Sequence, residues 1–469
     1  MGILTEQGYI MPSHPLDFQL QANYYATPEL LAVFDEQRRM NRWLQVEAAL
    51  ALAQGELGII PAEAANEING KANLAHLELA LIEKEYRQSR NSLMPVIKVL
   101  RQACREDFGQ YVHYGATTQD ILDTAQVLEL EEILQIVYRD LRVLEKLLIE
   151  NSEKHRNTPM IGRTHGQQAL PITFGLKTVT WAGELRRHIE RLKNLYPRVL
   201  VGQLSGAVGT MAALGPRGRE VAERTMALLN LQWKPPSWHT CRDNMAEVAS
   251  FFAILAGTLE KIANEIFLLG KTEVGELAES APAGPMSSTM PHKRNPVLCQ
   301  RVTVLARQIR ALTGVVVECM AHEHERDPRL LWSEWLAMPQ LSMYTGTAVH
   351  YLVNILDGLI VFDQNMKKNL FLQKDMVMSE WLLFRLAPVM GKMEAQEKLH
   401  VLLRRAGEEN RDLREILAGD LEIGPLLTED DLSAMDHPER YVGQAVELVN
   451  DTLADISALR KNDPEVLHT

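Results

Sequence analysis

Three short stretches of this 469-residue sequence hold side chains that could do chemistry. They are residues 113–120 (HYGATTQD), 162–171 (GRTHGQQALP) and 284–296 (GPMSSTMPHKRNP). The third stretch sets adjacent serines beside a His-Lys-Arg-Asn run, so hydroxyl, imidazole, cationic and amide groups lie close together. Such a strip can bind a small anion even in an acidic protein. The plain alternative is a structural loop, because Pro, Gly and Ser form turns and exposed Lys and Arg are solvated.

The order of residues in the third stretch favours a catalytic role over the plain loop. Ser-Ser-x-Met-Pro-x-Lys-x-Asn-Pro, at residues 287–296, resembles the signature of the fumarase/aspartase superfamily at every fixed position. The other two stretches resemble the remaining motif regions of that superfamily, in the expected order. The resemblance runs from about residue 25 to about residue 455. It implies an all-α homotetramer around a twenty-helix bundle, with each active site shared by three subunits.

The chemistry implied by the resemblance is β-elimination from a substituted succinate, which breaks a C–N or C–O bond and releases fumarate. By the same resemblance Ser287 is the base and His165 is the acid that protonates the leaving group. A serine hydroxyl is too weakly acidic to act unaided, so cations and backbone N–H groups must stabilise its alkoxide. The carbanion places a second negative charge on a carboxylate, so preorganised donors are the main catalytic need. An imidazole that titrates near neutrality suits the acid.

The resemblance also assigns residues that bind the substrate, a small di- or tricarboxylate. Lys293 and Asn295 match the residues that hold one carboxylate. Thr117, Thr118 and Gln119, at the start of a helix, would hold a second carboxylate with hydroxyl, amide and helix-terminal N–H donors. Further binding positions are matched by Thr164, His113 and Arg326. Each of these residues has a structural alternative as a cap or a solvated group, and the three motifs in order favour the functional assignment.

The branch of the superfamily is less well defined by the sequence. The pattern lies between adenylosuccinate lyase and 3-carboxy-cis,cis-muconate cycloisomerase. The second active-site histidine of the adenylosuccinate family falls at Asn91, and two arginines of its nucleotide site fall at Tyr24 and Trp335. Neither Tyr nor Trp can make the charged, forked contacts of Arg with phosphate. Met286 also stands where the superfamily signature has glycine, which puts the geometry of the loop in question.

We therefore predict a lyase that acts on a substituted succinate other than a nucleotide. The cycloisomerase, which forms a lactone, is the first alternative, since residues 91–98 and 332–335 resemble its pattern. The Thr-His-Gly at residues 164–166 is absent from that enzyme and favours a lyase. Adenylosuccinate lyase remains a further alternative. So does an inactive, crystallin-like structural protein, although recruitment would have tolerated the loss of Ser287, which is present.

Long helices must position these stretches. Apolar residues recur in alternating steps of three and four through residues 127–148, 248–269, 305–319 and 349–359, as in bundle helices. A single helix over residues 119–152 would be roughly 50 Å long. Thr117 and Asp120 fit a capping box at its start. We predict an all-α fold, with a helical N-terminal domain (1–114), an elongated central bundle (115–365) and a smaller helical C-terminal domain (366–469).

Composition limits the partners and the compartment. The net charge of −12 argues against nucleic acid or an anionic membrane as a partner. The four cysteines form no CxxC pair, which is typical of buried thiols in a reducing compartment. No secretory signal or membrane-length apolar run is present, so a cytoplasmic protein is expected. We expect no metal or other cofactor, because His322 and His324 form only a superficial metal-ligand pattern.

Overall fold

The computed structural model describes residues 14–18, 21, 24–280, 290 and 292–468. It is 68% helix and 4% strand, which confirms the predicted all-α class. No helix in these described parts of the chain is both long and apolar enough to span a membrane.

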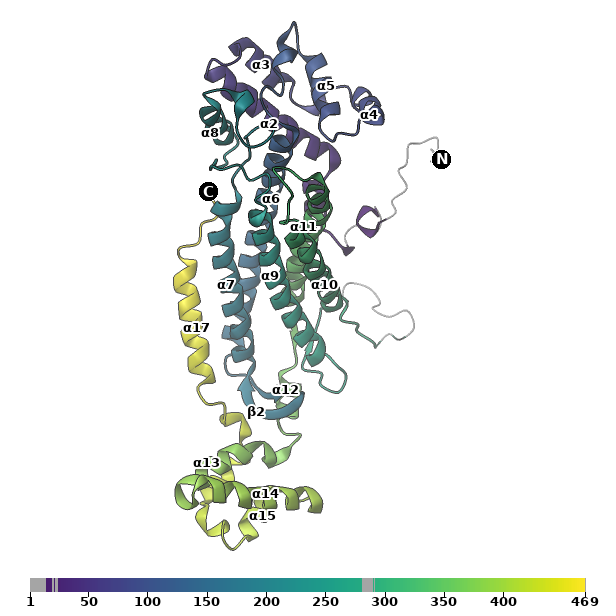
Figure 1. Cartoon of the computed structure of the whole chain (residues 1–469). Coiled ribbons are helices and arrows are strands. Elements are labelled where there is room, and N and C mark those ends of the chain that lie inside the picture. Colours follow the sequence, from purple (N-terminus) through teal and green to yellow (C-terminus); the bar gives the residue numbers. More distant parts are fainter. Residues whose placement is uncertain (1–13, 19–20, 22–23, 281–289, 291, 469) are drawn as a thin grey trace.

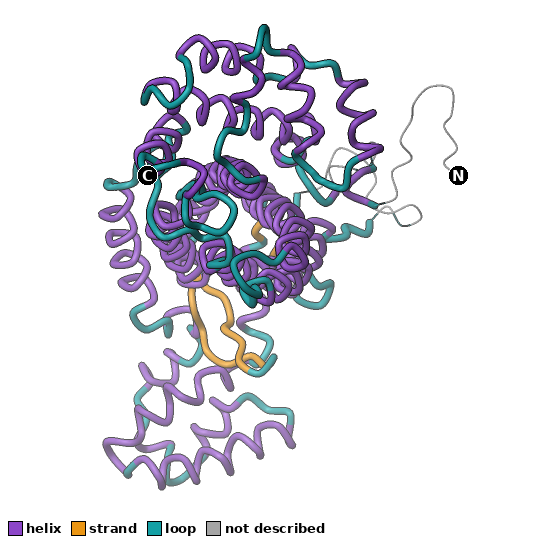
Figure 2. Tube along the Cα trace, turned by 45° about the horizontal axis from the view of Figure 1, so that its top comes forward, coloured by secondary structure: helices purple, strands orange, loops and turns teal. Residues whose placement is uncertain are grey.

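Long helices packed side by side form the central bundle (Figures 1 and 2). They are α6 (Thr118–Lys154), α7 (Phe174–Val199), α9 (Asp243–Leu269), α10 (Val297–Glu318) and α11 (Pro328–Asp357). The single helix predicted over residues 119–152 is confirmed as α6, whose 37 residues span about 55 Å. Its apolar stripe is buried, since Leu134, Val137 and Leu141 each have 0% exposure. Burial of that stripe holds so long a helix straight within the bundle.

Helix α7 was not among the heptad runs that the sequence revealed. Its buried face includes Thr178, Arg186 and His188 beside Leu185 and Leu192. Polar side chains interrupt the stripe, but apolar residues recur every three or four positions through Leu185, Ile189 and Leu192, so the periodicity of this helix is present in the sequence. The polar groups are nevertheless partnered: His188 Nε2 lies 2.9 Å from Thr258 Oγ1 of α9.

Smaller helices lie at both ends of the bundle (Figure 1). At one end are α2 (Glu36–Glu56), α3 (Ala62–Lys71), α4 (Leu79–Gln88), α5 (Met94–Ala103) and α8 (Gly218–Leu228), while α1 (Pro28–Val33) packs against the sides of α6 and α11. At the other end are α12 (Asp363–Leu370), α13 (Ser379–Met390), α14 (Lys392–Glu409), α15 (Leu413–Gly419) and α16 (Glu429–Ala434). Helices α13–α16 enclose a hydrophobic core of their own, built on residues such as Leu382 and Leu399. The domain limits at residues 114 and 365 stay a prediction.

Short 3-10 turns connect the helices. They are η1 (Pro15–Asp17), η3 (Leu74–His76), η4 (Phe108–Tyr111), η5 (Ala212–Leu214), η6 (Lys374–Met378), η7 (Gly424–Leu426) and η8 (Pro438–Arg440).

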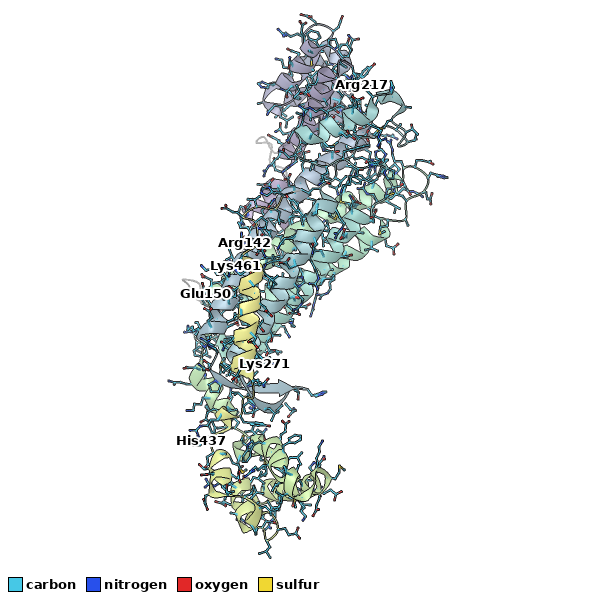
Figure 3. All side chains as sticks on the ribbon, turned by 90° about the vertical axis from the view of Figure 1, so that its left-hand side faces the viewer. Arg142, Glu150, Arg217, Lys271, His437 and Lys461 are labelled. Atoms are coloured by element: carbon cyan, nitrogen blue, oxygen red, sulfur yellow. The ribbon has the colours of Figure 1, made fainter. Side chains whose placement is uncertain are left out.

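The last helix, α17 (Ala445–Arg460), runs back along α7 (Figure 3). The segment after it is anchored by buried charge: Asp463 accepts hydrogen bonds from Arg186 Nη1 at 2.8 Å and Lys193 Nζ at 3.0 Å. The Tyr138 hydroxyl of α6 donates to the Pro464 carbonyl at 2.7 Å. The end of the chain is therefore fastened to the outside of the bundle.

A β-hairpin follows α6, where the sequence indicated only an irregular stretch. Strand β1 (Pro159–Thr164) pairs antiparallel with β2 (Gln167–Thr173). His165 and Gly166 form the two-residue turn, with φ of 53° and 75°. Positive φ at both positions is the type I′ geometry that suits the twist of a hairpin. A second short pair joins β3 (Leu277–Ala278) to β4 (Ile360–Val361).

Candidate active site

The N-terminus of α6 is held by Asp120, which is fully buried. Its carboxylate accepts a hydrogen bond from the Thr117 backbone N–H at 3.0 Å, the acidic half of the predicted capping box. It also accepts from the backbone N–H groups of Ser205 (2.9 Å) and Gly206 (3.0 Å), and it lies 3.0 Å from His239 Nε2. One side chain thus joins the start of the helix to the loops at residues 201–210 and 235–242.

Arg326 and His113 lie at the same end of the bundle. Arg326 Nη2 donates to Thr117 Oγ1 at 3.0 Å and also to the Ala207 carbonyl. His113 Nδ1 lies 2.6 Å from Glu47 Oε1. Burial lowers the pKa of His113, but the negative charges of Glu47 and Asp120 outweigh it, and the pKa is raised overall. A cation, an imidazole and the N–H groups at the start of α6 therefore face the same region, as an anion site needs.

Thr118 and Gln119 begin α6 but differ in their surroundings. Thr118 is half-buried, whereas Gln119 is only 2% exposed. Gln119 Nε2 donates to Asp123 Oδ2 and to the His239 carbonyl, each at 3.1 Å. Both N–H groups of the amide are thus used, so substrate contact through Nε2 would require one of these bonds to break. The predicted binding role of Gln119 stays a prediction.

Thr164 and His165 lie at the exposed tip of the β-hairpin, at the opposite end of α6. Arg163, one residue before them, forms a forked ion pair with the buried Glu276, at 2.7 and 3.0 Å. Asn369 Nδ2 donates to the same carboxylate at 2.8 Å. A braced strand therefore presents His165 to solvent, and no hydrogen bond of its side chain occurs within the described residues.

Lys293 and Asn295 precede α10, and Pro296 directly precedes its first residue. Lys293 is exposed. The first N–H groups of α10 are occupied by Glu279, whose oxygens accept from Leu298 N at 3.1 Å and Cys299 N at 2.6 Å. The predicted base, Ser287, and the departure at Met286 lie outside the described residues.

Within the described residues, one chain therefore does not bring the start of α6 close to His165 or Asn295. Thr118 starts α6 and His165 follows its end, about 55 Å away along the helix. Asn295 and Arg326 flank α10, whose 22 residues span about 33 Å. His113, Thr117, Thr118, Gln119 and Arg326 lie at one end of the bundle, whereas His165 and Asn295 lie toward the other end, where Arg163 pairs with Glu276 and Glu279 accepts from the start of α10.

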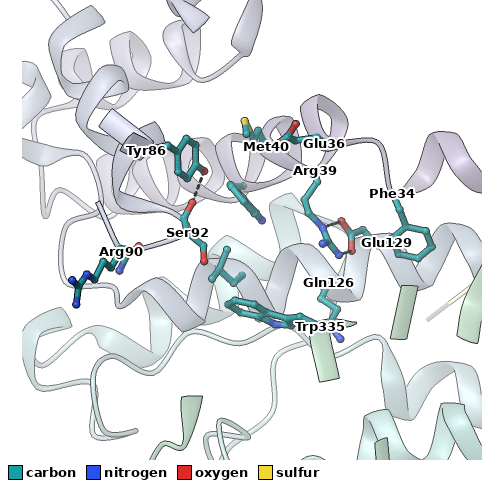
Figure 4. Close-up of a pocket in the computed structure, with 13 residues that line it drawn as sticks. Phe34, Glu36, Arg39, Met40, Tyr86, Arg90, Ser92, Gln126, Glu129 and Trp335 are labelled. Carbon is teal, nitrogen blue, oxygen red and sulfur yellow. Dashed lines mark hydrogen bonds and ion pairs between the residues drawn. The ribbon is translucent and has the colours of Figure 1, made fainter. Parts of the chain in front are cut away.

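A pocket of about 570 Å³ opens beside the start of α6 (Figure 4). Leu122, Gln126 and Glu129 line it from α6, at the spacing that places residues on one helix face, and Leu122 is one turn beyond Thr118. The remaining lining residues are Phe34, Glu36, Arg39, Met40, Trp43, Tyr86, Arg90, Asn91, Ser92 and Trp335. Two positions that the sequence marked as unusual, Asn91 and Trp335, thus lie on the wall of one pocket.

Most polar groups of this pocket already have partners. Arg39 forms a forked pair with Glu129, with both distances 2.8 Å (Figure 4). Asn91 Oδ1 accepts from the Leu93 and Met94 N–H groups at 2.9 and 3.0 Å, which leaves only its amide N–H groups for a ligand. Aromatic rings therefore make up much of the surface that a ligand would meet.

The sequence did not reveal the pocket residues Trp43, Tyr86 and Gln126. A signal was present in α6, where Gln126 and Glu129 belong to a run of buried polar residues that begins at Gln119. Tyr24, the third unusual position, lies elsewhere, with its ring centroid 4.0 Å from the guanidinium carbon of Arg301.

Two models of known protein families match this chain. A family model described as "Lyase" matches residues 23–311, and one described as "Adenylosuccinate lyase C-terminus" matches residues 375–452. The chain belongs to the fumarase/aspartase superfamily.

Relatives within the superfamily differ in the reactions for which they are named. The chain is 39% identical to N-acetyl-S-(2-succino)cysteine lyase of Dickeya dadantii, over 94% of this chain and 98% of that protein. It is also 39% identical to adenylosuccinate lyase of Pyrococcus horikoshii, over 96% and 99%. The crystal structure of 3-carboxy-cis,cis-muconate lactonizing enzyme from Pseudomonas putida superposes with a TM-score of 0.88 at 33% identity, covering 94% and 100%. The predicted superfamily is thus confirmed, while the specific reaction is open.

Proposed function

We propose that this chain is a lyase that releases fumarate from a substituted succinate whose leaving group is a small thiol. The substrate class is that of S-succinylated cysteine derivatives, as in the name of the Dickeya relative. The leaving atom is then sulfur, which extends the C–N or C–O chemistry expected from the sequence.

The observation that carries the proposal is the composition of the 570 Å³ pocket. Trp335 and Asn91 line it, and its Arg39 is already paired on both arms with Glu129. Arg39 therefore does not offer the free, forked guanidinium that phosphate recognition favours, whereas the exposed Arg90 of the same lining could bind a carboxylate of the leaving group. Aromatic walls can cover a small apolar group or stack on a purine, so the position that disfavours a nucleotide is Trp335, where the adenylosuccinate family has an arginine.

The proposed reaction uses the three groups of residues in separate roles. Ser287 removes a proton from the succinyl carbon next to a carboxylate, and Lys293 and Asn295 stabilise the charge that develops there. The start of α6, with Thr118, binds the second carboxylate. The C–S bond then breaks as the C=C bond of fumarate forms, and His165 protonates the departing thiolate.

Such a site requires more than one copy of the chain. Because about 55 Å separates Thr118 from His165 along α6, the groups can meet only between subunits. We therefore retain the homotetramer with shared sites as part of the proposal. The cytoplasmic location also stays a prediction.

Proton NMR of the purified protein with a substrate panel tests the proposal. The panel contains N-acetyl-S-(2-succino)cysteine, adenylosuccinate and 3-carboxy-cis,cis-muconate, with Ser287→Ala as the matched control. We expect fumarate from the thioether with the wild type and none with the variant. Fumarate formed only from adenylosuccinate would overturn the argument from Asn91 and Trp335. Turnover that persists in Ser287→Ala would overturn the assignment of the base.

The lactonising reaction is kept as a second candidate because of the TM-score of 0.88 with the Pseudomonas putida enzyme. Lactone formed from the muconate without fumarate from any substrate would establish it. No turnover of any panel member, in wild type and variant alike, would favour the structural-protein alternative.

A further inference from the structure

Arg242 lies in the loop before α9 and is completely buried, although it carries a charge. It holds two buried carboxylates at once. Its Nε and Nη2 atoms donate to the Glu334 oxygens at 2.9 and 2.5 Å, and Nη1 donates to Asp123 Oδ2 at 2.9 Å. The guanidinium carbon lies 4.8 Å from the ring centroid of Trp238. Helices α6 and α11 are therefore joined through one side chain.

Hydrogen bonds extend this cluster toward both parts of the candidate site. On α6, Gln119 directly follows Thr118, and its Nε2 atom donates to Asp123 Oδ2 at 3.1 Å. Gln126 Nε2, on the pocket wall, donates to Glu334 Oε1 at 2.9 Å. Glu334 directly precedes Trp335, which lines the same pocket.

Stability alone is a weak explanation for the cluster. Removing three charges from water is costly, and buried ion pairs are often no more stabilising than apolar groups of the same volume. One guanidinium also faces two carboxylates, so the cluster carries excess negative charge. The pKa of Asp123 is raised, because burial and, to a smaller extent, the charge of Glu334 together outweigh the lowering by Arg242. Such clusters can instead fix the relative position of elements that function requires.

We propose that Arg242, with Asp123 and Glu334, is a positioning unit that sets the distance between the carboxylate-binding start of α6 and the Trp335 wall of the pocket. These residues do not touch the substrate. They set the gap between the start of α6 and the Trp335 wall, which the substituted succinate must span. They therefore determine the affinity for this substrate. The kinetic part of this inference rests on the proposed function.

The test uses isosteric variants, Glu334→Gln and Asp123→Asn, which keep volume and remove charge. The matched control is Glu145→Gln, because Glu145 is also on α6, fully buried and paired with two arginines, Arg186 and Arg460. We expect KM for the thioether substrate to rise about tenfold in Glu334→Gln and Asp123→Asn, with kcat changed much less. Glu145→Gln should lower the melting temperature without raising KM. A KM that is unchanged in folded Glu334→Gln and Asp123→Asn, or raised equally in Glu145→Gln, overturns the inference.

Hydrogen–deuterium exchange gives a readout that needs no substrate. Glu334→Gln on α11 should speed amide exchange at residues 118–122 of α6, and Asp123→Asn should do so at residues 331–337. If one of the two variants does not fold, amide exchange in the other still tests the positioning role. Exchange that changes only in the mutated helix overturns the positioning role, even if the chain turns out to act on a different substrate. If the wild type releases no fumarate, the proposed function fails. Hydrogen–deuterium exchange still tests the coupling between α6 and α11.

Discussion

Thr118 and His165 lie beyond reach of each other within one chain, because the full length of α6, about 55 Å, lies between them. If both act on one substrate, they must come from different subunits. Assayed with an N-succinyl substrate, whose amine leaving group needs a proton, Thr118→Ala and His165→Asn should each lose most activity as pure proteins. After joint unfolding and refolding, mixed oligomers should regain activity, since some sites receive neither change.

The measurement is fumarate release by the refolded mixture against each variant refolded alone, with the mass of the oligomer from light scattering. A monomer, or a mixture no more active than its parents, would contradict shared sites.

The loss of kcat in His165→Asn should depend on which atom of the substrate leaves. A thiol has a pKa of about 8.5, so a thiolate departs with little help from an acid, whereas an amine needs a proton. The variant should therefore lose less kcat on an S-succinyl substrate than on the matching N-succinyl compound. Comparing kcat for the two substrates checks this, and equal losses would argue against His165 as the acid.

Changing the pocket wall should change the substrate preference. Asn91→His combined with Trp335→Arg restores groups that the adenylosuccinate family has at these positions. The kcat/KM for adenylosuccinate should rise about tenfold, the worth of one charge-assisted hydrogen bond. Leu336→Arg is the control, because Leu336 is adjacent but 72% exposed, outside the pocket lining. An equal gain in the control would show a nonspecific effect of charge.

Acid should destabilise the bundle through His188. Burial, together with the charges of Arg191 and Arg187, lowers the pKa of His188 from 6.5 to about 4. Between these two values the unfolded chain binds the proton and the folded chain does not, so the free energy of unfolding falls as the pH falls. Urea unfolding at pH 7 and pH 5 should show a smaller pH effect in His188→Gln than in the wild type. The exposed His76→Gln should behave like the wild type, and an unchanged pH effect in His188→Gln would rule out His188 as the cause.

Local patterns determined several features without the tertiary structure. The heptad stripe around Leu134 and Leu141 was enough to predict one continuous helix, because burial of an apolar stripe is a property of the helix itself. The acidic residue at position 120, three residues after Thr117, likewise marked the start of α6. The signature at residues 287–296 and the two other motifs were enough to predict the superfamily, which the comparisons confirm.

Other features arise only when distant segments pack together. The position of the hairpin that carries His165 depends on the ion pair of Arg163 with Glu276, which lies 113 residues further along the chain. The ion cluster of Arg242 joins residues 123, 242 and 334, whose closeness no local pattern encodes. The same is true of the pocket between Asn91 and Trp335. Sequence therefore determined which chemistry is available and which helices carry it, whereas packing decided where each group lies, because long-range contacts and not local periodicity set those distances.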